Sequence, residues 1–462
     1  MDTKKLRQKI LDLAIRGKLV PQDPNDEPAS VLLERIRAEK QQLIKEGKIK
    51  APRASKASDT SHYGNDNPPF DIPEGWVWTT IGELLCNRDE ERIPVSSAIR
   101  KKQTNKIYDY YGAAGVIDKV DSFLFNERLL LIGEDGANLL SRAKDNAFFA
   151  EGKYWVNNHA HILDCSDKEI LNYVALVINA MDLNPYITGT AQPKLNQDNL
   201  NKIFIPLPPK REQGEIISVV GRLEKVVQDL VDSARIMNIL IDKAKAMILT
   251  LAISGKLVPQ DPADEPAINL LKRINPDFVP CDNSHYPFEL PVGWTLSTFG
   301  LLNEHKSKSV NPMVEPDKNY ELYSVPIYET GKPEYIRGGS IGSTKQAVSE
   351  GEILVCKINP HLNRVWKVEH CCHELSCIAS SEWIVFSSQS LVPEFAVLYF
   401  QSPHFRDLLM SNVSGVGGSL MRARPSAVDG YPIPVPPIRE QDRIVKIVSS
   451  IMEMLTNLDK TI

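Results

Sequence analysis

The chain has 462 residues, enough for two or more domains, and its shares of hydrophobic (42%) and charged (24%) residues are ordinary for a soluble globular protein. No apolar run reaches the roughly 18 residues that a membrane span requires, the N-terminus carries no signal peptide, and seven cysteines in such a chain indicate a reducing cytoplasm. The net charge of −5 argues against a lone nucleic-acid binder, which is more often basic, unless charge is sorted locally or partners supply the phosphate contacts.

Residues 1–46 form the first expected segment, which is helical. An amphipathic helix and its end occupy residues 1–20, and a second helix is predicted from Ala29 to Glu46, after a turn rich in proline and acidic residues. Residues 47–71 are a linker rich in Gly, Ser, Ala and Lys, without periodicity. Its basic side chains could touch phosphate, although a solvated tether is the simpler interpretation.

A block of different texture, residues 72–208, begins with Pro-Glu-Gly-Trp at 73–76. It ends with a polar turn over 188–198, where glycine permits close approach of the backbone to a ligand. Gln and Asn in this turn could pair with adenine in a major groove, although a polar loop without a ligand is the alternative. Strands are predicted over 128–132 and 154–156, and a helix over 170–180.

The stretch from Lys210 to Ser254 is predicted to be one helix about 65 Å long. It begins after a Pro-rich stop at 205–209, because proline lacks an N–H and fixes φ, and Gly255 is a plausible C-cap. Apolar residues recur at alternating steps of four and three, which is typical of a helix packed lengthwise on another helix. This seam comprises Ile216, Val220, Leu223, Val227, Leu230, Ala234, Met237, Ile241, Ala244, Ile248 and Leu251. Such a helix suits a spacer; the alternative is one helix of an ordinary bundle.

The same stretch occurs a second time, cut in two. Ile-Pro-Leu-Pro-Pro-Lys-Arg-Glu-Gln at 205–213 returns as Ile-Pro-Val-Pro-Pro-Ile-Arg-Glu-Gln at 433–441, and the C-terminal helix follows. Gly-Lys-Leu-Val-Pro-Gln-Asp-Pro occurs at 17–24 and again at 255–262. We therefore expect the two termini to meet and to rebuild, without a covalent link, the helix that the centre holds in one piece. The molecule would be a circular repeat with pseudo-two-fold symmetry.

A second block, residues 290–436, mirrors the first at its edges and hardly at all inside. It begins with Pro-Val-Gly-Trp at 291–294, and we expect strands over 352–355 and 383–386 and a helix over 394–401. The expected fold is α+β: two α+β domains separated by two long antiparallel helices. The expected division of the chain is 1–46, 47–71, 72–208, 209–275, 276–289, 290–436 and 437–462, the last being a C-terminal spacer helix that pairs with the N-terminal segment.

These paired motifs resemble those of the specificity subunit (HsdS) of type I restriction–modification enzymes, and the resemblance covers nearly the whole chain. Its carriers are the paired Pro-Pro-x-Arg-Glu-Gln helix starts, the paired Gly-Lys-Leu-Val-Pro-Gln-Asp-Pro helix ends, the paired Pro-x-Gly-Trp starts of the two blocks, and Gly-Thr-Ala-Gln-Pro-Lys-Leu at 189–195. The resemblance implies that the blocks are target recognition domains, each reading half of a split double-stranded DNA site. It implies that the helices set the half-site spacing and dock two methyltransferase subunits, with restriction and translocase subunits completing the assembly.

Candidate DNA contacts are basic and polar residues inside the blocks and in the two closing turns. The second turn has Ser419-Leu420-Met421-Arg422 where the first has Ala191-Gln192-Pro193-Lys194, which makes a shared role less secure. For each candidate the alternative is an ordinary surface charge. The candidates are Lys101, Lys102, Gln103, Tyr110, Thr190, Gln192, Lys194, Asn196, Arg337, Lys345, Arg364, Ser419, Arg422 and Arg424.

Three patterns suggest catalysis or metal binding and are interpreted otherwise. Asn-Pro-Pro-Phe at 67–70 matches the tetrad of amino-methyltransferases but has no glycine-rich cofactor loop before it. Asp135 with Glu151 and Lys153 loosely mimics a nuclease site, although Gly152 weakens the strand that such a site needs. His-Cys-Cys-His at 370–373 lacks the spacing of a zinc knuckle pair.

We therefore predict a non-catalytic subunit without cofactor or metal, in the cytoplasm. The alternatives are a methyltransferase or nuclease that acts alone, and a helical scaffold with no DNA role.

Overall fold

The computed structural model describes residues 2–49, 68–189, 191–282, 286–369, 375–414 and 421–461. The chain divides into two compact units, Met1–Ser233 and Ala234–Ile462. Each unit has its own hydrophobic core and mixes helices with strands, which agrees with the expected α+β class.

The first unit begins and ends with helix. Its helices are α1 (Thr3–Ile15), α2 (Ala29–Lys45), α3 (Ile81–Leu84), α4 (Ser97–Lys102), α5 (Asn138–Ser141), α6 (Lys168–Ala180), α7 (Gln197–Asn201), the short 3-10 helices η1 (Asp89–Glu91) and η2 (Asn184–Tyr186), and the first half of α8 (Lys210–Ile253). Its strands are β1 (Val77–Thr80), β2 (Cys86–Asn87), β3 (Tyr108–Gly112), β4 (Gly115–Val120), β5 (Phe125–Asn126), β6 (Leu129–Gly133), β7 (Ala147–Ala150), β8 (Lys153–Val156), β9 (Ala160–Asp164) and β10 (Phe204–Leu207).

A buried strand and a buried helix hold the core of the first unit. The strands form two four-stranded sheets, β2-β9-β6-β7 and β4-β3-β8-β5. Every residue of β6 is buried, as its run of Leu-Leu-Leu-Ile predicts for a central strand. Helix α6, capped by the Asp167 side chain, buries eight of its 13 residues against β6, β7 and α1. The predicted strands at 128–132 and 154–156 and the predicted helix at 170–180 are confirmed within two residues.

The second unit repeats this plan with different strands. Its helices are α9 (Ala267–Ile274), α10 (Phe299–Leu302), α11 (Pro393–Gln401), α12 (Pro403–Ser411), α13 (Pro425–Val428), α14 (Ile438–Thr461), and the 3-10 helices η3 (Pro312–Val314), η4 (Tyr328–Thr330), η5 (Gly338–Ser340) and η6 (Pro360–Leu362). Its strands are β11 (Thr295–Thr298), β12 (Ser309–Val310), β13 (Asn319–Tyr323), β14 (Glu334–Arg337), β15 (Lys345–Ala347), β16 (Ile353–Cys356), β17 (Val365–Lys367), β18 (Ser376–Ala379), β19 (Trp383–Phe386), β20 (Val413–Ser414), β21 (Arg422–Ala423) and β22 (Pro432–Val435).

In the second unit β16 takes the place that β6 has in the first. It lies between β17 and β19, all its residues are buried, and β12, β15, β18, β13 and β14 form a separate sheet. Strand β19 and helix α11 confirm the elements predicted at 383–386 and 394–401. An antiparallel pair closes each domain beside its helices: β1 with β10 in the first unit, and β11 with β22 in the second.

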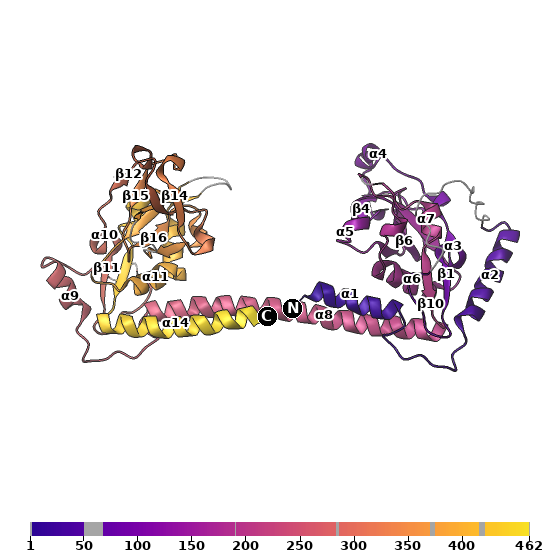
Figure 1. Ribbon diagram of the computed structural model, residues 1–462, viewed down its shortest axis with the longest axis horizontal. Helices are drawn as coiled ribbons and strands as arrows, with labels where there is room; N and C mark the ends of the chain where they lie inside the picture. Colours follow the sequence, from indigo (N-terminus) through magenta and orange to yellow (C-terminus); the bar gives the residue numbers. More distant parts are fainter. Residues whose placement is uncertain are drawn as a thin grey trace. The chain divides into compact units, whose positions relative to one another are not determined.

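Helix α8 is continuous over 44 residues, as its periodicity predicts. In the first unit α1 packs along its first half, where Arg7 lies 4.0 Å from Glu224 and Ile10 shares a core with Ile216 and Val220 (Figure 1). In the second unit α14 packs along its second half through one core that includes Leu249, Ala252, Ile444 and Val448 (Figure 1). Each half of α8 is therefore paired with a helix from one end of the chain.

The predicted apolar seam of α8 is buried only in part. Ile216, Val220, Val227 and Ile241 are buried, whereas the side chains of Leu230 and Met237 remain about 40% exposed, at 42% and 40%. The prediction that the whole seam packs against another helix is therefore wrong for its central residues, Leu230 and Met237. Periodicity shows which face of a helix is apolar, but not whether a partner in the same chain covers it.

The repeated sequence motifs form the junction between each domain and its helices. In the first unit, the Gln22 amide donates to the Gly17 carbonyl (2.7 Å) and to the Glu212 carboxylate (3.0 Å). In the second, Gln260 donates in the same way to Gly255 (2.8 Å) and Glu440 (3.1 Å). These bonds join Gly-Lys-Leu-Val-Pro-Gln-Asp-Pro to Pro-Pro-x-Arg-Glu-Gln, which explains why both motifs occur twice.

The glycine in each junction is a steric requirement. Gly255 has φ +66°, and a Cβ there would lie 2.2 Å from Cγ of Pro291. We expect Gly255→Ala to lower the free energy of unfolding by about 2–3 kcal/mol, since left-handed backbone strain and overpacking add. Gly47→Ala is the control, because Gly47 has a similar φ of +71° but nothing within 4 Å. Denaturant unfolding of the two variants measures the difference, and equal losses would show that the contact with Pro291 is unimportant.

Candidate nucleic-acid interface

Five backbone hydrogen bonds shape the closing turn of the first domain and connect it, through the loop after β6, to the start of β9. Thr188 and Lys194 exchange N–H···O bonds of 2.8 and 2.7 Å, which makes the turn a small hairpin. Leu195 N–H donates to the Glu134 carbonyl (2.7 Å), and Gly136 N–H donates to the Pro193 carbonyl (3.1 Å). Glu134 N–H donates to the carbonyl of His159, just before β9 (2.8 Å). We call the three bonds that involve residues 134, 136, 159, 193 and 195 the first frame.

The second domain contains the same frame with other side chains. Ala423 N–H donates to the Lys357 carbonyl (2.9 Å), Asn359 N–H to the Met421 carbonyl (2.8 Å), and Lys357 N–H to the Glu382 carbonyl (2.9 Å). Here β20 and β21 form the hairpin. We call these three bonds the second frame. The two domains differ inside, but the same pattern of three backbone hydrogen bonds holds the closing turn in each of them.

The two frames place a cation at the same position. Lys194 and Arg422 are equivalent, and each pairs with a carboxylate: Lys194 Nζ lies 3.2 Å from Glu134, and Arg422 Nη2 lies 2.9 Å from Glu382. Both basic side chains are half exposed, at 52% and 51%. The sequence difference between the two turns therefore preserves the positive charge that a DNA contact requires.

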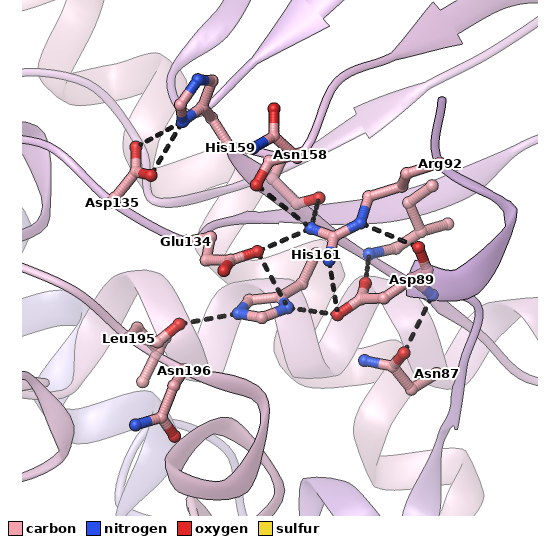
Figure 2. A network of polar contacts seen from close by, with 12 residues as sticks. Asn87, Asp89, Arg92, Glu134, Asp135, Asn158, His159, His161, Leu195 and Asn196 are labelled. Carbon is pink, nitrogen blue, oxygen red and sulfur yellow. Dashed lines mark hydrogen bonds and ion pairs between the residues drawn. The ribbon is translucent and has the colours of Figure 1, made fainter. Parts of the chain in front are cut away.

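Beneath the first frame lies a buried polar network, drawn in Figure 2. The His161 side chain is 1% exposed; its Nδ1 lies 2.6 Å from the Asp89 carboxylate, and its Nε2 lies 2.7 Å from the Leu195 carbonyl oxygen. Although burial acts to raise it, hydrogen bonding and charge from His161 hold the pKa of Asp89 below its ordinary value. Both ring nitrogens of His161 thus lie within hydrogen-bond distance of oxygen atoms, one of the Asp89 carboxylate and one of the Leu195 carbonyl.

Arg92 completes the network on the side opposite Leu195. Its Nη1 lies 2.6 Å from Glu134 and donates to the carbonyl of Ala160 (2.8 Å), while its Nη2 lies 3.4 Å from Asp89. The side chains of Arg92, His161 and Lys194 thus surround the two carboxylates. The network ties η1, β9 and the closing turn together, so it fixes the turn from below.

Asp89, Glu134 and His161 are also the kind of group that could hold a metal ion. One ligand atom from each lies within 4.8 Å of the others. However, these atoms are already hydrogen-bonded or ion-paired, and Arg92 and Lys194 neutralise the two carboxylates. A divalent cation would have to displace these partners, so the residues do not fit a metal centre.

His159 and Asp135 form a second, more exposed pair beside the first frame. His159 Nδ1 lies 2.7 Å from Asp135, and the two side chains are 49% and 33% exposed. Figure 2 shows the other ring nitrogen of His159 turned away from Asp135. Glu151 is the second acidic residue of the nuclease-like pattern that contains Asp135. Its carboxylate lies 2.6 Å from the Arg128 guanidinium.

Strand register shows what replaces the network in the second domain. His161 lies opposite Ile132 in the β6–β9 pair, and Ile384 lies opposite Val355 in the β16–β19 pair. Ile384 therefore stands where the first domain has His161. The second domain thus has a partly buried isoleucine, packed against its core, where the first domain has the polar network.

The predicted contacts of the first domain lie on two elements. Lys101 and Lys102 are exposed at the end of α4 and Gln103 follows them, half-buried. In the closing turn Gln192 and Lys194 are exposed and Asn196 caps α7 through a bond from Asn199 N–H (2.8 Å). Thr190 lies outside the described residues.

The prediction of Tyr110 as a DNA contact is wrong. Tyr110 is 1% exposed, its hydroxyl accepts from Val95 N–H (3.0 Å), and its ring stacks under the Arg100 guanidinium. A side chain inside the domain does not reach a base edge, so Tyr110 supports α4 from within. The sequence places Tyr110 near a basic run, but the pairing of β3 with β4 and β8 decides its burial.

The predicted contacts of the second domain are more dispersed. Arg337 is exposed at the end of β14, Lys345 begins β15, and Arg424 is exposed beyond β21. The guanidinium of Arg364 donates to the Ile358 carbonyl (3.0 Å), so it holds the loop beside the second frame. Ser419 and the histidines and cysteines at 370–373 lie outside the described residues.

Sequence reasoning missed Asp89, His161 and Glu382. The available signal for His161 was a titratable residue inside the apolar run Ala160–Leu163, which suggests a buried polar partner. Its partner Asp89 lies 72 residues away, and no local pattern connects the two.

Comparison with known proteins agrees with the expected family. A family model described as Type I restriction modification DNA specificity domain matches residues 73–235. The EcoEI specificity subunit of Escherichia coli is 28% identical over 98% of this chain and 90% of its own length. These matches support a specificity subunit of the type I restriction enzyme family. The EcoAI specificity subunit of Escherichia coli is 31% identical over 66% of this chain, which spans 64% of that relative's length.

The named relatives are specificity subunits, which are non-catalytic, and the matches support this role for the chain. A solved structure titled for the assembly and conformational transition of the type I R-M system is similar with a TM-score of 0.50, at 15% identity, over 85% of this chain and 94% of that one. This likeness concerns the fold. Among the helices of the described residues, none is both long and apolar enough to cross a membrane.

Proposed function

We propose that this specificity subunit binds double-stranded DNA at a bipartite target. Each closing turn, with its frame, would meet one half-site. The single observation that carries the proposal is the pair of equivalent frames, which present Lys194 and Arg422 at the same position on unlike domains. Two copies of one scaffold with different side chains are what a protein needs to read two different short sequences.

Under this proposal the helices set the distance between the half-sites. At about 1.5 Å per residue the 44 residues of α8 span about 66 Å, the length of about 19 base pairs at 3.4 Å each. A circular repeat, in which the N-terminal and C-terminal helices together rebuild a second copy of α8, would give the two domains inverted orientation. Each domain would then read one strand direction, and residues 72–208 and 290–436 would be the two target recognition domains.

We further propose that the helices dock two methyltransferase subunits, and through them the restriction and translocase subunits, in the cytoplasm. The support is the number of large apolar side chains that are exposed on the helices, which is unusual for a surface that water alone covers. Its residues are Val226, Leu230, Val231, Ile236, Met237, Ile239, Leu240 and Met247 of α8, with Ile447, Met454 and Leu458 of α14. Methyltransferase subunits would also supply phosphate contacts that a chain of net charge −5 lacks.

The test is methylation by reconstituted complexes. The purified chain is mixed with the methyltransferase subunit of its own system, methyl donor and a library of random duplexes, and methylated sequences are read. We expect methylation only in the mixture, and only at one split motif. Methylation or magnesium-dependent cleavage by the chain alone would contradict the proposal, as would methylation without a shared motif.

A further inference from the structure

The second frame places an acidic and a basic side chain next to each other. This combination suggests which DNA base pair the two side chains could contact. Glu382 accepts from Arg422 Nη2 at 2.9 Å, and the two side chains are 27% and 51% exposed. Backbone interactions hold both residues in place. The Glu382 carbonyl accepts a hydrogen bond from Lys357 N–H, and Arg422 forms an isolated β-bridge with Ile358. The pair therefore sits at the point where the closing turn meets the loop after β16.

A G·C pair offers complementary groups in the major groove. Cytosine presents an N4 amino donor, which a carboxylate accepts, and guanine presents O6 and N7 acceptors, which a guanidinium fork can meet together. A carboxylate paired with one edge of a guanidinium keeps its second oxygen and leaves the other edge of the guanidinium available. Glu382 and Arg422 thus match both partners of a single G·C pair.

We propose that Glu382 and Arg422 together read one G·C pair in the second half-site and are specificity-determining residues of this subunit. The inference rests on the proposed DNA-binding function and deepens it. The frame in the first domain supports the assignment, because His159 stands at the position of Glu382 and Lys194 at that of Arg422. The change from Glu and Arg to His and Lys at equivalent positions is the change expected where the two halves read different bases.

An ordinary surface ion pair is the competing explanation, and it predicts a different result. Such pairs contribute little to stability, and removing one leaves base preference unchanged. The decisive measurement is therefore the identity of the methylated bases and not the stability of the protein.

The experiment uses the complete methyltransferase complex assembled with the Glu382→Gln variant and the random duplex library. Glutamine pairs with adenine through its amide, so we expect one position of one half-site to change from C to A preference. Methylation of the original site should fall about tenfold to a hundredfold, as for the loss of one base contact. The other half-site should stay unchanged. Glu329→Gln, an exposed acid on η4 of the same unit, is the matched control and should methylate the original site normally.

An unchanged motif, or an equal loss on all sequences, would overturn the inference. If Glu382→Gln does not assemble with the methyltransferase, Arg422→Lys answers the same question, because lysine keeps the charge but lacks the guanidinium fork. That variant should tolerate other bases at the guanine and nowhere else, and an unaltered motif would again overturn the inference. If the wild-type complex selects no split motif, the proposed function fails and the inference fails with it.

Discussion

Replacing His161 by isoleucine should lower the free energy of unfolding by about 3–5 kcal/mol. The change removes the ring that contacts the buried Asp89 carboxylate, and the loss of one partner from a buried, hydrogen-bonded charge costs about this much. Asp89 would keep Arg92, at 3.4 Å, and the N–H of Ile162, at 2.8 Å, but it would lose its shortest contact. The Leu195 carbonyl would also lose the donor that holds the closing turn. Denaturant unfolding of the wild type and the variant measures the loss.

Isoleucine is chosen as the replacement for His161 because the second domain has Ile384 at the equivalent position. The equivalent backbone position of the second frame therefore holds an isoleucine, so the substitution gives both frames the same residue at this point. His159→Gln is the control, since His159 lies two residues away with half of its side chain exposed; its pair with Asp135 should be worth less than about 1 kcal/mol. Equal stability of His161→Ile and the wild type would show that the network contributes nothing.

The same variant should affect DNA reading on one side only. Under the proposed function, the reconstituted methyltransferase complex with His161→Ile should accept more bases in the half-site of the first domain, because its closing turn is no longer tied to Asp89 through the ring. The half-site of the second domain, whose frame has Ile384 in place of this histidine, should keep its bases. Relaxation of both half-sites would contradict a local role for His161.

The elements of this fold were predictable where the signal is local. The Pro-rich stops and apolar period of residues 205–254 define α8, and the apolar run at 129–132 defines a buried strand. The repeated motifs predicted a repeated structure, and the Gln22–Glu212 and Gln260–Glu440 bonds give the physical reason for the repetition.

The site was predictable only in part, because its contacts join distant segments. Lys194 and Arg422 were predicted from the turns that carry them, but their frames depend on residues about 35–60 and 40–65 positions earlier in the chain. Burial of Tyr110 follows from strand pairing, which a sequence does not display locally. The network of Asp89, Arg92 and His161 likewise exists only once η1 and β9 are side by side.

The helix seam separates two kinds of apolar residue, and a pair of substitutions tests the distinction. Val227 is 3% exposed in the core that also holds Ile10 and Ile216, whereas Leu230, one step along the same seam, is 42% exposed. Val227→Glu should lower the free energy of unfolding by about 4 kcal/mol, because it loses about 1.5–3 kcal/mol of apolar burial and places a carboxyl group among apolar side chains.

Leu230→Glu should change the free energy of unfolding by less than about 1 kcal/mol, as surface substitutions do. If methyltransferase subunits cover this face, as we propose, the Leu230→Glu chain should fold normally but bind its methyltransferase more weakly, which titration of one purified subunit with the other would measure. A large loss of stability for Leu230→Glu would instead mean that the chain itself buries this residue in solution. Equal binding by Leu230→Glu and the wild type would move the docking surface elsewhere. The exposed part of the seam therefore discriminates between a helix pair completed within the chain and one completed by a partner.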